Sequence, residues 1–184
     1  MKTYFGSTNL DTNYPVRAVV AIGNFDGVHL GHQEILKRAF AHAKQLACPV
    51  VCFTFNPHPT FELRPESLLK LLMTYEEKRK TLAGFGVPFC VEEKFDPDFA
   101  HTTAPKFFHE ILKSRLHAEA IVVGGNFAFG KAREGTIDVL ARFCQETHTA
   151  LDIVPAFLVN EAPVSSSRIR QALSSGELEL AEQL

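Results

Sequence analysis

The sequence predicts an α/β protein built on a mostly parallel, five-stranded sheet with helices on both faces. Five short apolar runs, rich in Val and Ile, recur along the chain, and longer amphipathic stretches separate them. Continuous rather than alternating apolarity is typical of parallel strands that are buried on both faces. Strands that alternate with helices favour parallel pairing through right-handed crossovers. The expected strands are residues 17–23, 49–55, 87–91, 120–124 and 151–155.

The stretches between these runs are expected to be helices. Between residues 35 and 43, apolar side chains recur at helical spacing and basic side chains occupy the other side. Pro105 stands at a first-turn position, where a proline is tolerated. Residues 56–65 are expected to form a loop, because three prolines there remove backbone donors. The expected helices are residues 35–43, 75–83, 105–116, 136–147 and 165–173.

Length and composition indicate one globular domain. The chain has 184 residues, of which 46% are hydrophobic and 22% charged, which excludes a disordered tail or a coiled coil. A net charge of −2 and a pI near 6.4 provide no basic surface for nucleic acid and no polybasic membrane anchor. No apolar run approaches the ~18 residues of a membrane span, and the first residues lack a secretory signal. A cytoplasmic location is expected.

The four cysteines are expected to be reduced, buried thiols. Their positions show no C-x-x-C spacing, and three lie in or beside apolar runs. They are Cys48, Cys52, Cys90 and Cys144.

Polar, Gly-rich and basic segments follow four of the expected strands. Parallel strands end at one edge of a sheet, where ligands bind, so these segments are expected to gather on one rim. They are residues 23–32 (GNFDGVHLGH), 56–59 (NPHP), 124–130 (GGNFAFG) and 165–170 (SSSRIR).

His29 and His32 flank Gly31 where the first loop becomes the first helix. A helix N-terminus offers free N–H groups and partial positive charge, which suit a phosphate. Gly31 allows the phosphate to approach the backbone, and two imidazoles can donate hydrogen bonds to phosphoryl oxygens. Alternatives are a metal pair, which lacks a third ligand nearby in sequence, and a histidine that only caps the helix.

Residues 165–170 form a second candidate anion site. Three serines can cap a helix, and Arg170 lies four residues after Ser166 on the same side. Arg168 points away, and the alternative is an ordinary cap with solvated arginines. If the helices that start near Gly31 and Ser166 open onto one crevice, they can clamp a triphosphate while a second phosphate attacks its α-phosphorus in line. The loop matches neither a P-loop nor G-x-G-x-x-G.

Four ordered segments resemble one known family. Residues 23–32 resemble the H-x-G-H nucleotidyltransferase signature, with His29 and His32 as its histidines, in the form carried by prokaryotic FAD synthetases. Residues 165–170 resemble the I-S-S-T-x-I-R segment of that family, with Val164 at its Ile and Ser167 at its Thr. Residues 53–59 and 124–130 resemble segments that flank the flavin site. The resemblance implies a Rossmann-like nucleotidyltransferase fold that transfers AMP from MgATP to FMN, giving FAD and pyrophosphate.

The resemblance also implies roles for particular residues. Contacts to the ATP phosphates are implied for His29, His32, Ser166, Ser167 and Arg170. Nucleotide contacts are implied for Gly23, Asn24, Phe25 and Gly31, and flavin contacts for His58, Pro59 and Asn126. The resemblance implies that Mg²⁺ is held largely by phosphate oxygens and water, and no protein ligand is assigned to it.

Two departures from the family pattern matter. Gly125 stands where the family often has an acidic residue, and Ala128 where it often has a larger one. In addition, the usual chain continues into a riboflavin kinase domain, whereas this sequence ends at Leu184, so kinase activity is not expected. The alternatives are another H-x-G-H nucleotidyltransferase acting on a different phosphate substrate, and a flavin-nucleotide-binding module without turnover.

Overall fold

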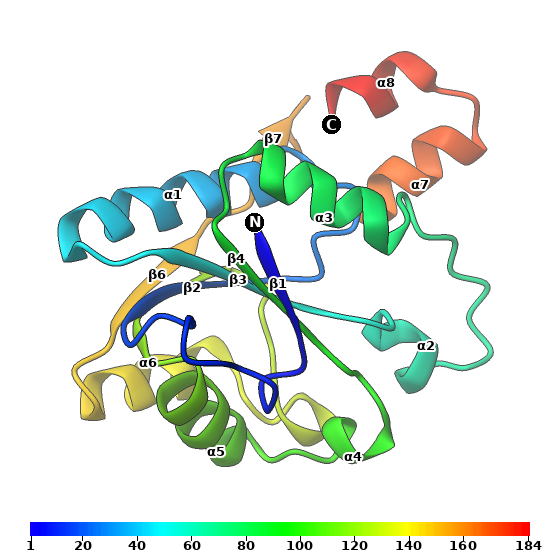
Figure 1. Ribbon diagram of the computed structural model, residues 1–184. Coiled ribbons are helices and arrows are strands. Elements are labelled where there is room, and N and C mark those ends of the chain that lie inside the picture. The colour runs from blue at the N-terminus through cyan, green and yellow to red at the C-terminus, as the bar shows by residue number, and fades with distance from the viewer.

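The computed structural model describes residues 1–184 as a parallel sheet between two layers of helices (Figure 1). The sheet order is β1-β4-β3-β2-β5-β6, and every pair in it is parallel. One core cluster lies between the sheet and helices η1 and α6, and another lies between the sheet and helices α1 and α3. The strands are β1 (Lys2–Phe5), β2 (Ala18–Ile22), β3 (Val50–Phe55), β4 (Phe89–Glu93), β5 (Ala118–Gly124) and β6 (Ala150–Val154).

All five expected strands are present, but the sheet has six strands rather than five. The additional strand, β1, lies at the edge and pairs with β4. It has four residues, of which only Tyr4 is buried, so it lacks the apolar run that identifies the other strands. A two-residue antiparallel hairpin, β7 (Leu158–Val159) with β8 (Ala162–Pro163), was also not expected.

The expected helices are present with shifted ends. They are α1 (Leu30–Leu46), α3 (Tyr75–Gly84), α5 (Ala104–Lys106) continuing into the π-helix η1 (Phe107–Arg115), α6 (Ile137–Glu146) and α7 (Ser166–Ser174). The short elements α2 (Pro59–Leu63), α4 (Pro97–Ala100) and η2 (Lys131–Arg133) were not expected. The helix α8 (Leu178–Gln183) follows α7 and agrees with the expectation of a last helix that reaches Leu184. The prediction that residues 56–65 form only a loop was wrong, because Pro59 occupies the first turn of α2, where its missing donor costs nothing.

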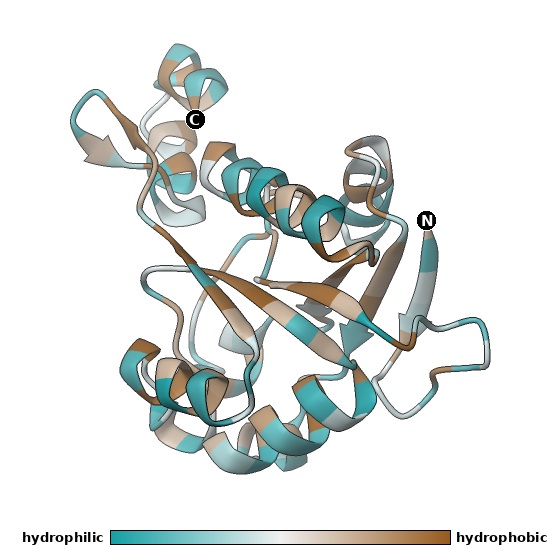
Figure 2. Ribbon diagram, turned by 90° about the vertical axis from the view of Figure 1, so that its left-hand side faces the viewer, coloured by the Kyte–Doolittle hydropathy of each residue, from teal (hydrophilic) through white to brown (hydrophobic).

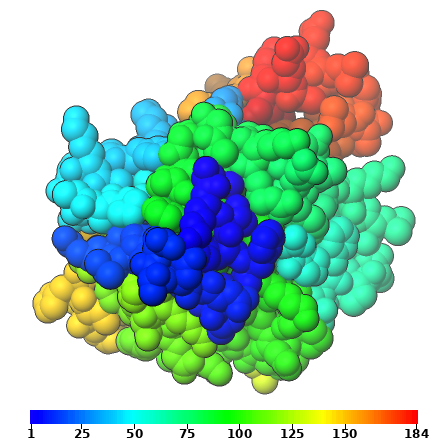
Figure 3. All heavy atoms as spheres, in the orientation of Figure 1, coloured from blue at the N-terminus to red at the C-terminus, as the bar shows by residue number.

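The order of the strands in the sheet indicates where a ligand would bind. Strands β3 and β4 lie on one side of β2, whereas β5 and β6 lie on the other. In such a sheet, ligands bind beyond the carboxyl ends of the strands where the order reverses, here β2 and β5. Figure 2 shows α7, α8 and the β7–β8 hairpin gathered beside one end of the sheet, and Figure 3 shows α7 and α8 protruding from the body.

Gly27 permits the sharp turn between β2 and α1. Its φ is +85°, and a Cβ there would lie 2.7 Å from Leu72 Cδ1. We expect Gly27→Ala to lower the free energy of unfolding by about 1–3 kcal/mol, mainly through backbone strain. Gly84→Ala is the matched control, since Gly84 has open space around its α-carbon and its φ lies outside the left-handed region. If urea denaturation gave the same free energy of unfolding for both variants, the prediction would be wrong.

Candidate active site

The first loop ends at a histidine that caps α1. His29 Nδ1 accepts from the backbone N–H of His32 at 3.4 Å, and the two rings stack with their centroids 3.7 Å apart. A Cβ on Gly31 would lie 3.2 Å from the His29 ring, closer than an ordinary contact, so glycine favours this close packing. His29 therefore caps α1, and both imidazoles lie at the helix N-terminus, where the predicted contacts to phosphate stay open to them.

His32 has an unused polar atom. Its ring packs between His29 and the fully buried Phe25, whose ring centroid is 5.2 Å away. The Nδ1 atom of His32 is buried and has no hydrogen-bond partner. Because buried polar groups are nearly always paired, an orphaned nitrogen here favours a ligand-binding role.

Burial keeps both imidazoles uncharged near neutral pH. Desolvation lowers the pKa of His29 to about 4, with the Asp26 carboxylate opposing the shift. Desolvation also holds the pKa of His32 well below its ordinary value, and His29 and Lys78 add to the effect. The rings can therefore donate neutral N–H groups to a phosphate and gain charge as negative charge develops there.

These shifts predict acid-sensitive stability. Unfolded histidine binds its proton near a pKa of 6.5, whereas folded His29 does so only near a pKa of about 4. Between these values the unfolded chain binds more protons, so stability is full above 6.5 and is lost as the pH falls towards 4. We expect the Tm of a His29→Asn/His32→Asn variant to fall less on acidification than that of the wild type, as followed by circular dichroism. Parallel pH dependences in the two proteins would contradict this assignment.

The second helix N-terminus faces the same loop. Ser165 caps α7 by accepting from Arg168 N–H at 3.2 Å, and Ser166 Oγ donates to the Asp26 carbonyl at 2.9 Å. A Cβ on Gly31 would lie 3.8 Å from the Val164 carbonyl oxygen. The N-terminal ends of α1 and α7 therefore lie next to each other beside the first loop, as the predicted arrangement requires.

Arg170 and Arg168 diverge as expected from their spacing. Arg170 donates through Nη2 to the Asp26 carboxylate and through Nε to the Lys70 carbonyl at 2.7 Å. Arg168 instead donates to the carbonyls of Val159 and Ala162 in the hairpin, at 2.9 and 2.8 Å. Only Arg170 is turned towards the first loop.

Asp26 links the first loop to α7, and the sequence analysis did not identify it as a site residue. It is 4% exposed, and its carboxylate accepts from Arg170 and from Leu72 N–H at 2.9 Å. The signal that could have identified it is its position. It is a carboxylate in a Gly-rich loop that precedes a helix, and an arginine was expected on the same rim. Asp26 fixes the guanidinium of Arg170 at the junction of the two helices.

The predicted flavin loop is held by β4 and α3. His58 caps α2, accepting from Thr60 N–H at 3.2 Å, and its own N–H donates to Tyr75 Oη at 2.8 Å. Burial lowers the pKa of His58. Asn56, which precedes a cis proline, donates to Glu92 Oε2 at 3.2 Å. The positions of His58 and Pro59 are thus set by side chains outside the loop.

The remaining predicted residues lie around the same edge. Gly23 directly follows β2, the Asn24 carbonyl accepts two hydrogen bonds, and Ser167 is exposed in the first turn of α7. Asn126 is exposed in the loop after β5, where Phe127 and Phe129 stack with centroids 5.5 Å apart. The substrate contacts of these residues stay predictions.

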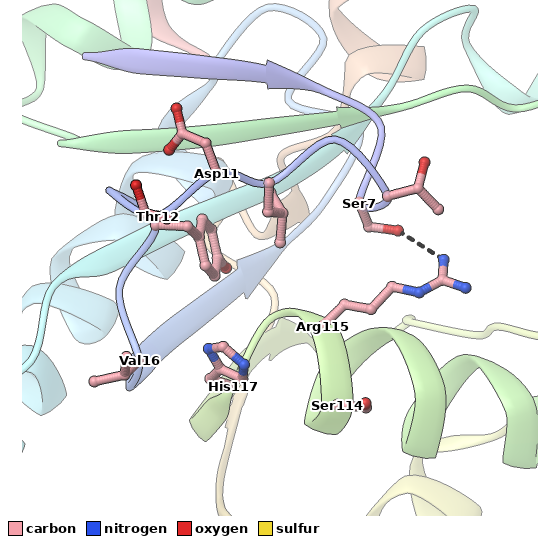
Figure 4. Close-up of a pocket in the computed structure, with 10 residues that line it drawn as sticks. Ser7, Asp11, Thr12, Val16, Ser114, Arg115 and His117 are labelled. Atoms are coloured by element: carbon pink, nitrogen blue, oxygen red, sulfur yellow. Dashed lines mark hydrogen bonds between the residues drawn. The ribbon is translucent and has the colours of Figure 1, made fainter.

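A cavity of about 560 Å³ lies away from all of these residues (Figure 4). The loop from Ser7 to Val16 and the end of η1 form it, and Arg115 there donates to Ser7 Oγ at 3.2 Å. None of the predicted site residues lines it.

Solved structures share the fold. A crystal structure described as a macrolide-efflux protein from Streptococcus pneumoniae aligns with a TM-score of 0.87 and 30% identity, covering 99% of this chain and 60% of that one. None of the helices described here is long and apolar enough to cross a membrane. A pantoate-beta-alanine ligase from Francisella tularensis aligns with a TM-score of 0.61 at 13% identity, covering 98% of this chain and 76% of that one, which shows similarity of fold alone.

Sequence comparison identifies relatives that are named for the synthesis of flavin nucleotides. The FAD synthetase of Listeria monocytogenes is 35% identical over 91% of this chain and 68% of its own. Two proteins named bifunctional riboflavin kinase/FMN adenylyltransferase are 33% identical, one from Buchnera aphidicola and one from Escherichia coli K12. They match 91% and 100% of this chain, but the match spans only 54% and 59% of theirs. The FAD synthetase family matches residues 11–168, and the chain belongs to that family.

Proposed function

We propose that this chain transfers AMP from MgATP to FMN, giving FAD and pyrophosphate. Membership of the FAD synthetase family supports the activity. The observation that carries the mechanism is the convergence of the N-termini of α1 and α7 on Asp26, through Ser166 and Arg170. This convergence gathers imidazole, hydroxyl and guanidinium donors beside the carboxyl end of β2.

The proposed step is an in-line displacement at the α-phosphorus of ATP. An oxygen of the FMN phosphate forms a bond to that phosphorus while the bond to the bridging oxygen of the β-phosphate breaks. The electron pair of the broken bond leaves with pyrophosphate. His29 and His32 would donate to oxygens that gain charge, and the α1 N-terminus would add its dipole.

Arg170 and the serines of α7 would hold the leaving end of ATP. The guanidinium is only partly used by Asp26 and the Lys70 carbonyl, so donors remain for a polyphosphate. Ser166 and Ser167 lie in the first turn of α7, where backbone N–H groups are also free. Positioning and charge stabilisation would carry the rate, as in other phosphoryl transfers.

The chain's own donors suit Mg²⁺ only as a companion of the substrate. No group of three or more His, Cys, Asp or Glu residues is arranged to hold a metal ion. The carboxylate at the site, Asp26, already accepts from Arg170 and Leu72. Mg²⁺ bound through phosphate oxygens and water would neutralise part of the triphosphate charge.

The proposal covers adenylyl transfer alone and places the chain in the cytoplasm. Free ATP and reduced thiols are available there, and the four cysteines form no disulfide in this structure. The riboflavin kinase activity named for the bifunctional relatives is not proposed for these residues.

The test is incubation of the purified chain with FMN, ATP and Mg²⁺, followed by chromatographic separation of flavins and measurement of pyrophosphate. FAD and pyrophosphate should form in equal amounts, and chelation of Mg²⁺ should stop both. Release of pyrophosphate with a different phosphate substrate and not with FMN would assign another nucleotidyltransferase activity. Tight FMN or FAD binding without pyrophosphate release would overturn the proposal in favour of a binding module.

A further inference from the structure

A buried lysine that the proposed mechanism does not use lies between the loop after β2, where the nucleotide is predicted to bind, and the His58 loop, where the flavin is predicted to bind. Lys78 on α3 is 4% exposed. Its Nζ donates to the Asn24 carbonyl at 3.3 Å, to Thr54 Oγ1 at 3.1 Å and to the Phe55 carbonyl at 3.2 Å. Asn24 belongs to the loop after β2, whereas Thr54 and Phe55 end β3, just before the His58 loop. The amine therefore joins the carboxyl ends of two neighbouring strands.

These contacts fix the charge of Lys78. A neutral amine has two N–H groups, whereas an ammonium has three. Two of the acceptors are carbonyls, which only accept, and the Thr54 hydroxyl hydrogen is already donated to the Asn24 carbonyl at 3.1 Å. All three contacts thus require protons on Lys78, so the side chain is a positive charge.

No carboxylate neutralises this charge at ion-pair distance. Glu92 pairs with Arg79 at 3.0 Å, and Asp26 pairs with Arg170. Burial lowers the pKa of Lys78, and the more distant Glu92 and Asp26 carboxylates oppose that shift. A buried cation without a contacting counterion is costly, so an anionic ligand nearby would gain unusually strong attraction.

The charge reaches both predicted substrate regions. Burial is the main cause of the lowered pKa of His32 on the nucleotide side and of His58 on the flavin side, and the positive charge of Lys78 adds to both shifts. Its Nζ also lies 5.1 Å from the centroid of the Tyr75 ring, and the hydroxyl of that ring holds the His58 N–H. One cation is therefore coupled to both loops through hydrogen bonds and through the Tyr75 ring.

We propose that Lys78 is a positioning residue whose fixed positive charge lets the phosphate of FMN and the α-phosphate of ATP occupy the site together. The two phosphates repel each other, and a cation held between the loops attracts both. The inference rests on the proposed function, because it requires FMN and ATP to meet at this edge. It predicts that Lys78 matters most when both phosphates are present.

The test measures binding of FMN and riboflavin with and without an α,β-methylene analogue of ATP, which cannot transfer AMP. Riboflavin lacks the phosphate and so reports on the loops without the repulsion. In the wild type, the analogue should change the affinity for either flavin by less than about threefold. In Lys78→Gln, the analogue should weaken FMN binding by roughly 10- to 100-fold and riboflavin binding by less than about threefold.

Lys80→Gln is the matched control, because Lys80 lies on the same helix, is exposed and pairs only with Glu76. It should behave as the wild type. Equal losses of FMN and riboflavin in Lys78→Gln, independent of the analogue, would show a purely structural role and overturn the inference.

Two further measurements keep the test decisive. If Lys78→Gln does not fold, Lys78→Met replaces it. The effect of the ATP analogue on FMN binding to the wild type is also a test by itself. An analogue that weakens FMN binding to the wild type more than about tenfold, but leaves riboflavin binding unchanged, would mean that Lys78 offsets no repulsion. FAD formation by the wild type is measured in parallel, so failure of the proposed function is seen separately from failure of the Lys78 coupling.

Discussion

We expect Arg170→Ala to reduce kcat for FAD formation by about 100- to 1,000-fold and to leave FMN affinity within about threefold of the wild type. The guanidinium is turned towards the junction of α1 and α7, and its proposed partner is the leaving pyrophosphate. Its loss would remove stabilisation of charge that grows during the proposed reaction, whereas the residues predicted to contact the flavin lie on other loops. Steady-state kinetics and flavin titration measure the two effects.

The variant needs a control for the charge that it leaves behind. Asp26 is 4% exposed, so Arg170→Ala leaves a buried carboxylate unpaired and lowers stability. The double variant Arg170→Ala/Asp26→Asn removes that orphaned charge and should recover stability but not turnover. Arg168→Ala is the matched control on the same helix, because Arg168 holds only the hairpin carbonyls. Normal turnover in folded Arg170→Ala would remove Arg170 from the mechanism.

Replacing either imidazole at the start of α1 should have a comparable effect. We expect His29→Asn and His32→Asn each to lower kcat by about 100-fold or more, with FMN affinity within about threefold. Asparagine at position 29 keeps a side-chain oxygen for the helix cap, so the change removes the imidazole and not the helix start. At position 32 no hydrogen bond of Nδ1 is lost, since it has no partner.

His117→Asn is the matched control for both histidine variants. His117 lines the separate cavity of Figure 4 and donates to, or accepts from, no residue of the site. Its kcat should equal that of the wild type. A His32→Asn variant with normal kcat would show that the orphaned nitrogen does not serve the reaction.

Local sequence patterns predicted most of the fold because they depend on short-range chemistry. Each expected strand is a continuous apolar run, and β2 is buried at all five positions. The Pro-rich segment was misjudged because the same residue type that ends a ladder also starts a helix, as Pro59 does in α2. β1 was missed because an edge strand buries too little to require an apolar run.

Motifs and residue spacing along the chain are enough to predict the family, the parallel sheet and the two polar helix starts at Gly31 and Ser166. Which side chains meet is visible only in the folded chain, where Asp26 contacts Arg170 across 144 positions and Lys78 contacts Asn24 across 54. Such pairs depend on how strands far apart in the chain are ordered in the sheet.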